Sequence, residues 1–77
     1  MFKEHKRIVL ISDILEEGLV AGDVGTIVHI HPGGEAFVVE FMALDGNTVA
    51  IATVLPSQAR LVTDKDITHA RKMTMTD

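Results

Sequence analysis

The amino-acid sequence predicts a small all-β domain of five short strands. Glycine, proline, aspartate and asparagine separate apolar runs that are rich in Val and Ile, and this pattern is typical of strands joined by turns. The 77 residues suffice for one domain with a thin core. The chain has three aromatic residues, all Phe, and no Cys. The core must therefore be built from aliphatic side chains, without disulfides or thiolate metal sites.

The first strand is predicted over residues 7–11, a β-branched run short enough to be buried on both sides. Residues 12–22 follow as a loop. Ile14, Leu15, Leu19 and Val20 are available there to fold back over the core. A short helix over residues 12–18 is the alternative, because Ser12 is a possible N-cap.

A hairpin over residues 22–41 is the clearest element. Gly33 and Gly34 accept positive φ without steric cost, and a two-residue hairpin loop needs such residues. This loop sets the predicted pairing of the two strands. The predicted pairs on the core face are Ile30–Phe37, Val28–Val39 and Thr26–Phe41. The predicted pairs on the outer face are Ile27–Glu40 and His29–Val38.

Three further elements complete the predicted sheet. Asp45 and Gly46 predict a second turn, and residues 48–54 form a strand after it. Pro56 ends that strand, and a single 3₁₀ turn over residues 56–58 would lead into a short last strand over residues 59–62. Residues 63–77 form a tail that either contains a short helix, with Ile67 and Met73 on one face, or is frayed.

This layout is typical of a small five-stranded SH3-like barrel, because closing the sheet removes its exposed edges. The predicted division is an N-terminal arm over residues 1–6, the barrel over residues 7–62 and the tail over residues 63–77. The predicted core consists of Val9, Ile11, Val24, Val28, Ile30, Phe37, Val39, Phe41, Val49, Ile51 and Leu61.

Charge is distributed unevenly along the chain, whose formal net charge is −4. All Lys and Arg lie at the two ends, and residues 8–59 contain none. Seven acids occupy that central stretch, so a polyanion would have to bind at the ends. Nucleic-acid binding depends largely on Lys and Arg at phosphates. The sequence therefore disfavours nucleic acid as the partner of the domain body.

Three stretches of the chain, Gly18–Val28, Gly33–Phe41 and Leu55–Val62, resemble a bacterial family of small proteins called domain of unknown function 4926. The resemblance covers about residues 7–62. It implies an SH3-like barrel without an assigned activity, whose genes often accompany toxin or nuclease-like genes. The glycine spacing is also loosely similar to the KOW motif of ribosomal and transcription-factor barrels, but the basic residues usual in those barrels are missing.

The outer hairpin face is the predicted partner-binding surface. Its residues are Ile27, His29, His31, Val38, Glu40 and Glu35. His29, His31 and Glu40 are also the residue types of a 2-His-carboxylate metal site, although paired histidines on a strand are more often ordinary surface residues. No nucleophile with a base or paired inward carboxylates can be identified, so the sequence predicts neither catalysis nor a cofactor.

The sequence thus predicts a non-catalytic protein-interaction module, an accessory or antitoxin/immunity-like partner of a protein encoded nearby. An acidic body would suit a basic protein partner. Two alternatives stay open, a KOW-like RNA-binding barrel and a homo-oligomeric structural protein. The missing Cys, signal peptide and apolar span favour a cytoplasmic protein that does not enter membranes.

Overall fold

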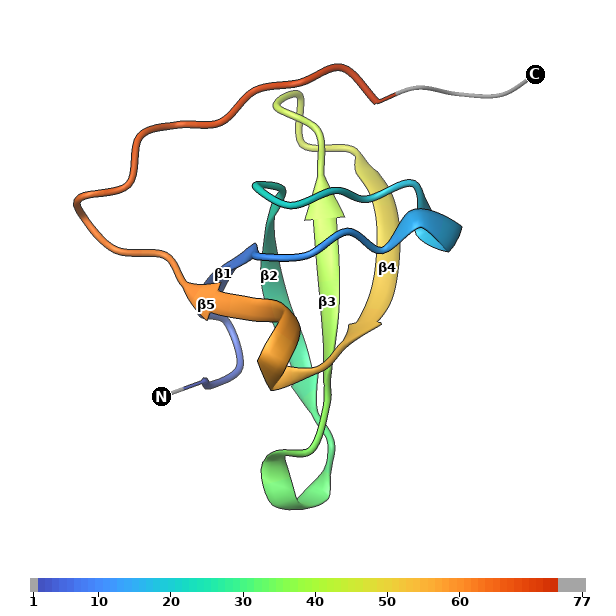
Figure 1. The fold of residues 1–77 in the computed structure, drawn as a ribbon, viewed down its shortest axis with the longest axis vertical. Helices are drawn as coiled ribbons and strands as arrows, with labels where there is room; N and C mark the ends of the chain where they lie inside the picture. Colours follow the sequence, from blue (N-terminus) through green and yellow to red (C-terminus); the bar gives the residue numbers. More distant parts are fainter. Residues whose placement is uncertain (1, 74–77) are drawn as a thin grey trace.

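Five antiparallel strands form one sheet in the computed structural model, which describes residues 2–73 (Figure 1). The strands are β1 (Arg7–Leu10), β2 (Val24–Ile30), β3 (Phe37–Met42), β4 (Thr48–Val54) and β5 (Ala59–Leu61). Their order across the sheet is β4-β3-β2-β1-β5. Short 3₁₀ turns lie at η1 (Leu15–Glu17), η2 (Pro32–Gly34) and η3 (Pro56–Gln58). The predicted all-β class with five strands is confirmed.

The sheet is open, so the predicted closure into a barrel is wrong. β4 and β5 lie at opposite ends of the strand order, and in the described part of the chain no ladder joins them. The reason is local. β5 has three residues, all of which pair with β1, and η3 turns the chain between the two strands. The predicted 3₁₀ turn is present, but it leaves two free sheet edges.

One face of the sheet carries the core. On β3 the predicted core residues Phe37, Val39 and Phe41 are buried, as expected. The core cluster consists of Ile8, Leu10, Ile14, Leu19, Ile27, Phe37, Val39, Phe41, Ala52, Val54 and Ala59. The predicted core residues that are exposed instead are Ile11, Val28, Val49 and Ile51. On the other strands the prediction therefore often chose the wrong face.

A β-bulge explains the error on β2. The pairs Ile30–Phe37 and His29–Val38 are those that the hairpin predicted. The register then shifts between Ile27 and His29, so that Ile27 lies opposite Val39. An extra residue in one strand reverses the alternation of side chains beyond it. Ile27, predicted on the outer face, is fully buried.

The packing around Phe41 explains the error on β4. Phe41 pairs with Gly25 on β2 and with Ala50 on β4, so its ring lies between two small neighbours. A Cβ at Gly25 would lie 2.5 Å from Val39 Cγ1 and 2.9 Å from Phe41 Cδ2. The large ring thus requires small residues beside it. This places Ala50 rather than Val49 on the inner face.

The β2–β3 connection is wider than predicted. Gly33 and Gly34 have φ of +81° and +70°, as the turn requires. The His31 N–H donates to the Ala36 carbonyl at 2.9 Å, so four residues rather than two form the loop. The second predicted turn is present at Gly46, whose φ is +90°.

Two segments outside the sheet complete the core. Ile14 and Leu19 fold over it as predicted, with η1 between them in place of the alternative helix. Leu15, also expected to fold back, is exposed. The N-terminal arm packs against the sheet, because the Phe2 ring lies 4.6 Å from that of Phe37 and the His5 N–H donates to the Ile27 carbonyl at 2.7 Å.

The C-terminal segment, defined here as residues 63–73, contains no helix and arches away from β5 towards the loop before β2 (Figure 1). The helix that the sequence allowed there is absent from these described residues. Residues 74–77 of the predicted tail lie outside them. Within residues 2–73, no helix is long and apolar enough to cross a membrane.

Candidate functional site

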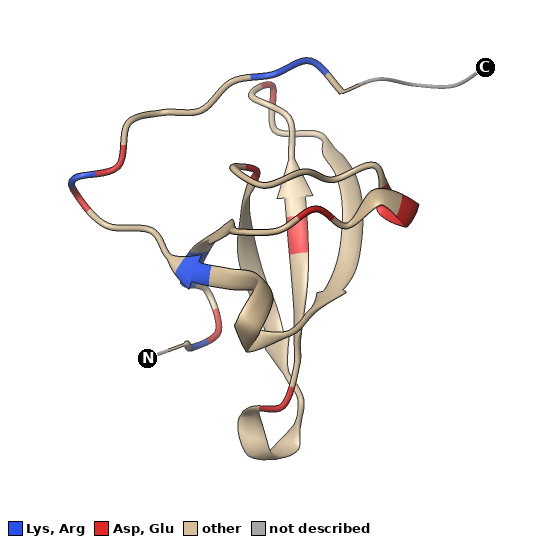
Figure 2. Cartoon of the chain, viewed as in Figure 1, with Lys and Arg blue, Asp and Glu red and all other residues tan. Residues whose placement is uncertain are grey.

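Lys and Arg lie only near the two ends of the chain, whereas most acids lie between them (Figure 2). Seven acids lie on the loops of the body and on β3, and Lys and Arg lie on the N-terminal arm, on β1 and β5 and on the C-terminal segment, together with Glu4, Asp64 and Asp66. The C-terminal segment therefore brings positive charge back to an acidic body. Its contacts with that body form the candidate site.

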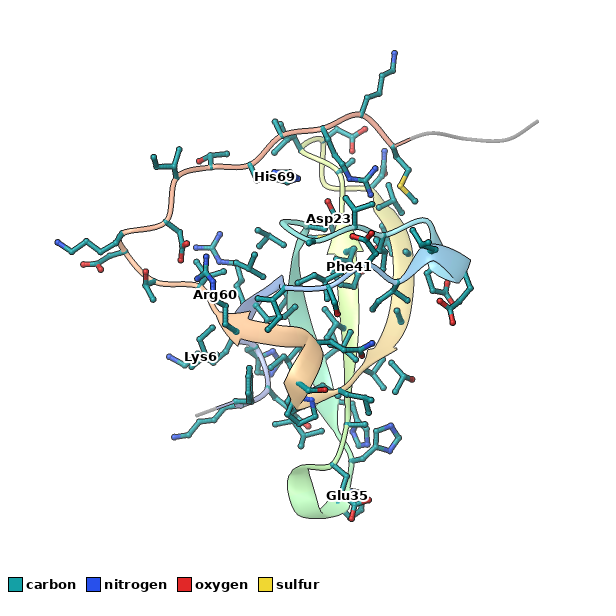
Figure 3. All side chains as sticks on the ribbon, viewed as in Figure 1. Lys6, Asp23, Glu35, Phe41, Arg60 and His69 are labelled. Atoms are coloured by element: carbon teal, nitrogen blue, oxygen red, sulfur yellow. The ribbon has the colours of Figure 1, made fainter. Side chains whose placement is uncertain are left out.

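Asp23 is the main anchor of the C-terminal segment. Its carboxylate is buried and accepts two hydrogen bonds from Arg71, from Nε at 2.7 Å and from Nη2 at 2.6 Å. The Val20 N–H donates to the same carboxylate at 2.9 Å, and His69 Nε2 lies 3.3 Å from it. Figure 3 shows His69 facing Asp23 from the segment. This is a two-point Arg–carboxylate pair, the most specific geometry for such a contact.

The environment of Asp23 favours its charged form. Burial by itself would raise the pKa of the Asp23 carboxyl. The hydrogen bonds from Arg71, Val20 and His69 and the positive charge of Arg71 outweigh burial and lower that pKa below its ordinary value. The same pair raises the pKa of Arg71. Asp23 is therefore an ionised structural group rather than a proton donor at neutral pH.

A second ion pair holds the other end of the segment. Arg60 on β5 donates to Asp66 through Nη1 at 3.0 Å and Nη2 at 2.6 Å. The Thr63 N–H donates to Asp66 at 2.7 Å, and these bonds hold the pKa of the Asp66 carboxyl well below its usual range. The pair is largely exposed to solvent, so it orients the chain more than it stabilises the fold.

A groove of about 840 Å³ lies between the C-terminal segment and the outer face of the sheet. Val9 and Glu40 are among the residues of the sheet wall. Val9, predicted in the core, is buried and also lines the floor of this groove. Four large apolar side chains that line the groove are exposed, with 41 to 92% of their surface accessible. They are Met42, Leu44, Val49 and Ile67.

The predicted hairpin surface is only partly assembled. His29 and His31 lie together, with ring centroids 5.4 Å apart, and Glu35 is exposed at the loop. Val38 and Glu40 are half-buried on the sheet. Ile27 is not part of this surface, because the bulge turns it into the core. Of the large apolar side chains on this hairpin, Val28 and Met42 are the exposed ones.

The three metal-ligand candidates do not converge. Glu40 accepts a hydrogen bond from the Thr48 hydroxyl, and His29 Nδ1 lies 3.9 Å from Glu4 rather than beside Glu40. Among the described residues, no group of three or more His, Asp or Glu side chains is arranged to hold a metal ion. The structure therefore gives no support to a site at His29, His31 and Glu40.

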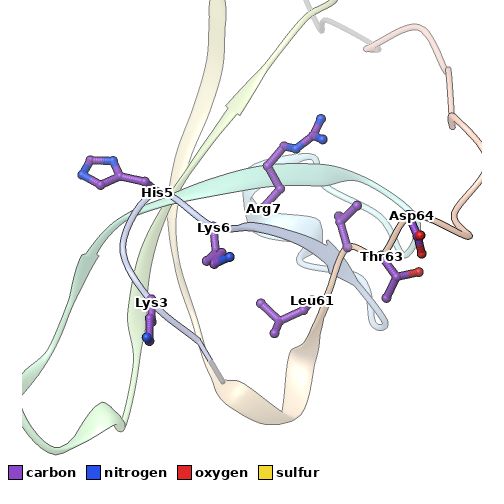
Figure 4. A pocket seen from close by; sticks show the side chains of 8 residues that line it. Lys3, His5, Lys6, Arg7, Leu61, Thr63 and Asp64 are labelled. Atoms are coloured by element: carbon purple, nitrogen blue, oxygen red, sulfur yellow. The ribbon is translucent and has the colours of Figure 1, made fainter.

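A shallow basic pocket of about 660 Å³ lies at the junction of the N-terminal arm and β5 (Figure 4). One side of the pocket is lined by Lys3, His5, Lys6 and Arg7, and the other side by residues 61–64. The pocket shares Arg7, Val62, Thr63 and Asp64 with the groove.

Sequence reasoning missed the Asp23 anchor. Asp23 follows Gly22 in an evident turn, where an acid is ordinarily solvated. Its partner Arg71 is 48 positions away in a segment without a periodic pattern. The sequence contained one weak indication of this contact, because Lys and Arg occur again only after residue 59. Charge alone does not select which acid a distant arginine contacts.

Comparison with known proteins identifies the family. The family model described as "Domain of unknown function (DUF4926)" matches residues 4–61. No curated protein and no solved structure matches the chain. The matched range includes the sheet and residues 4–6 of the N-terminal arm, and it ends before the C-terminal segment. With this match over more than half of its length, the chain belongs to the DUF4926 family of domains of unknown function.

Proposed function

We propose that the protein is a non-catalytic interaction module that docks another protein in the groove beneath its C-terminal segment. The observation that carries this proposal is the gathering of four exposed apolar side chains, Met42, Leu44, Val49 and Ile67, along one groove. Apolar patches rimmed by polar groups are typical of protein-binding surfaces. An accessory or antitoxin-like role, in which the module binds and restrains its partner, requires only such a surface.

The net charge of the chain favours a particular partner. Acidic and basic residues line the groove in equal number, and Asp23 and Asp66 are each paired with an arginine. The chain as a whole carries a formal charge of −4. Complementary charge steers encounter and suppresses wrong partners. We therefore expect a protein segment with apolar side chains flanked by Lys or Arg.

A matched pair of double variants tests the proposal. Met42→Asp/Leu44→Asp places charge in the groove, whereas Leu15→Asp/Leu55→Asp makes the same change at exposed apolar residues outside it. A partner captured from the native host is purified and titrated against each protein. We expect at least tenfold weaker binding for the groove variant, because buried unpaired charge costs about 1.4 kcal/mol or more, and unchanged binding for the control. Equal affinities for folded variants would contradict docking in the groove.

RNA binding is the second candidate, and the basic pocket favours it. Lys3, Lys6 and Arg7 lie together there, although the acidic body repels a polyanion. Titration with single-stranded RNA at low and moderate salt separates the two functions. We expect no micromolar binding. Tight binding with a steep salt dependence that Lys3→Glu/Lys6→Glu removes would favour the RNA function instead.

A further inference from the structure

The two free edges of the sheet are protected very differently. β5 is three residues long, carries Arg60 at its centre and follows Pro56, all features that discourage pairing with another strand. β4 has the sequence TVAIATV over seven residues, without charge or proline. High β-propensity and no charge are the features of an edge that pairs. β4 is the edge that lacks protection.

The hydrogen-bonding groups on the outer edge of β4 are free in the described chain. In an antiparallel ladder, alternate residues direct their N–H and C=O groups away from the neighbouring strand. Between residues 2 and 73, no backbone hydrogen bond outside the sheet ladders involves Thr48–Val54. Figure 1 shows β4 at the margin of the sheet, and among the described residues no backbone hydrogen bond joins it to η1.

The sequence of β4 is nearly symmetric about Ile51. Ala50 and Ala52 flank it, and the residues beyond them on both sides are β-branched. If two such strands pair antiparallel about a two-fold axis at Ile51, each Ala50 lies opposite Ala52 of the partner subunit, and each Val49 opposite Thr53 of the partner subunit. The axis then brings two Ile51 side chains together, and each is 60% exposed in the single chain.

We propose that two copies of this chain pair through β4, antiparallel about Ile51, into one continuous sheet with five strands from each copy. No like charges meet across the axis, because β4 has none. Uncharged β-branched residues opposite one another stabilise such a pairing. This inference goes beyond the proposed function and uses the backbone edge of β4, from which Val49 alone also lines the groove.

Mass measurement on the full chain tests the pairing. Sedimentation and light scattering should give twice the 8.4 kDa chain mass for the wild type. Ile51→Lys places two positive charges at the axis, and its mass should fall to that of one chain. Ile67→Lys makes the same change at a 92% exposed residue of the C-terminal segment and should remain dimeric. Ile51→Lys mixed with Ile51→Glu should recover the dimer mass.

Second variants keep the test decisive. In Val49→Glu/Thr53→Lys, each new Glu lies opposite the new Lys of the partner subunit, so two pairs of opposite charges form across the axis. This variant should dimerise, and it can be measured even if Ile51→Lys does not fold. Met42→Asp/Leu44→Asp should also stay dimeric, so that loss of docking and loss of pairing are distinguished. A wild-type mass of one chain at about millimolar concentration would overturn the proposal. So would a folded Ile51→Lys protein that remains dimeric.

Discussion

Single residues decide which side chains face the core. Gly25 lets the Phe41 ring approach the backbone of β2, and no larger residue fits there without displacing Val39. Asp23 is a buried acid whose carboxylate is fully used by Arg71, Val20 and His69. Gly25 must be small because Val39 and Phe41 fill the space beside it, and Asp23 is charged because Arg71 pairs with it. Both are therefore testable by single substitutions.

Substitution of Gly25 separates steric crowding from backbone strain. Gly25→Ala should lower the free energy of unfolding by about 1–3 kcal/mol, because its Cβ overlaps Val39 and Phe41. Gly34→Asn should cost less, about 0.5 kcal/mol, since nothing lies near its Cβ and Asn accepts positive φ. Urea unfolding measures both. Equal losses would show that crowding at Gly25 is relieved by small shifts.

Acidification should weaken the Asp23 anchor. The pKa of Asp23 is lower in the folded than in the unfolded chain, so its contribution is complete above the unfolded value, about 3.9, and is lost as the pH falls through the lower folded value. Stability of the wild type should therefore drop from about pH 6 to about pH 2 more than that of Asp23→Asn. Urea unfolding at both pH values checks this. An equal drop in the two proteins would contradict it.

Elements are connected in this fold by a few specific contacts. In the hairpin of β2 and β3, the loop sets the pairing of His29 and Ile30 with β3. The bulge between Ile27 and His29 then shifts the pairing by one residue over the rest of β2. The C-terminal segment has no regular structure, and two ion pairs, Asp23–Arg71 and Arg60–Asp66, hold it over the outer face. Its attachment depends on side chains rather than on a backbone ladder.

Removal of residues 63–77 should leave the sheet folded. Backbone amides of β1–β3 should stay protected from hydrogen exchange, because the core cluster contains no residue of the C-terminal segment. The free energy of unfolding should fall by about 1–3 kcal/mol, as Asp23 loses its charged hydrogen bonds. Asp23→Asn should then have a smaller effect in the shortened chain than in the full one. Loss of protection throughout the sheet would contradict this view of the segment.

The whole molecule is an open sheet with its core on one face and a groove on the other. The C-terminal segment covers part of the outer face, and five of the exposed large apolar residues lie along the groove or on β4: Met42, Leu44, Val49, Ile51 and Ile67. Docking in the groove and pairing through β4 share only Val49, because pairing uses the backbone edge of β4. The two proposals can therefore hold together, and a dimer would present two grooves to its partners.

Thermal unfolding should depend on protein concentration if β4 pairs. A ligand or subunit that binds only the folded chain raises its apparent stability by mass action. The Tm of the wild type should therefore rise by a few degrees when its concentration is raised about a hundredfold. The Tm of Ile51→Lys should stay constant over the same range. A constant wild-type Tm would argue against dimerisation.

The sequence by itself determined the strands, their turns and the family. Local chemistry was sufficient for these: Gly33, Gly34 and Gly46 have the positive φ that their turns required, and alternation on β3 identified Phe37, Val39 and Phe41 as core. The resemblance to DUF4926 is confirmed over residues 4–61. The protein-binding surface, by contrast, was predicted with Ile27 in it, a residue that the structure buries.

Only the tertiary structure decided which faces are buried and which acid anchors the C-terminal segment. β4 is apolar or β-branched at every position, so its period cannot select a face, and the space beside Phe41 places Ala50 inside. The bulge at Val28 moves Ile27 into the core, and no local pattern marks it. Asp23 and Arg71 meet across 48 positions. These outcomes depend on non-local packing, which residue patterns along a chain do not encode.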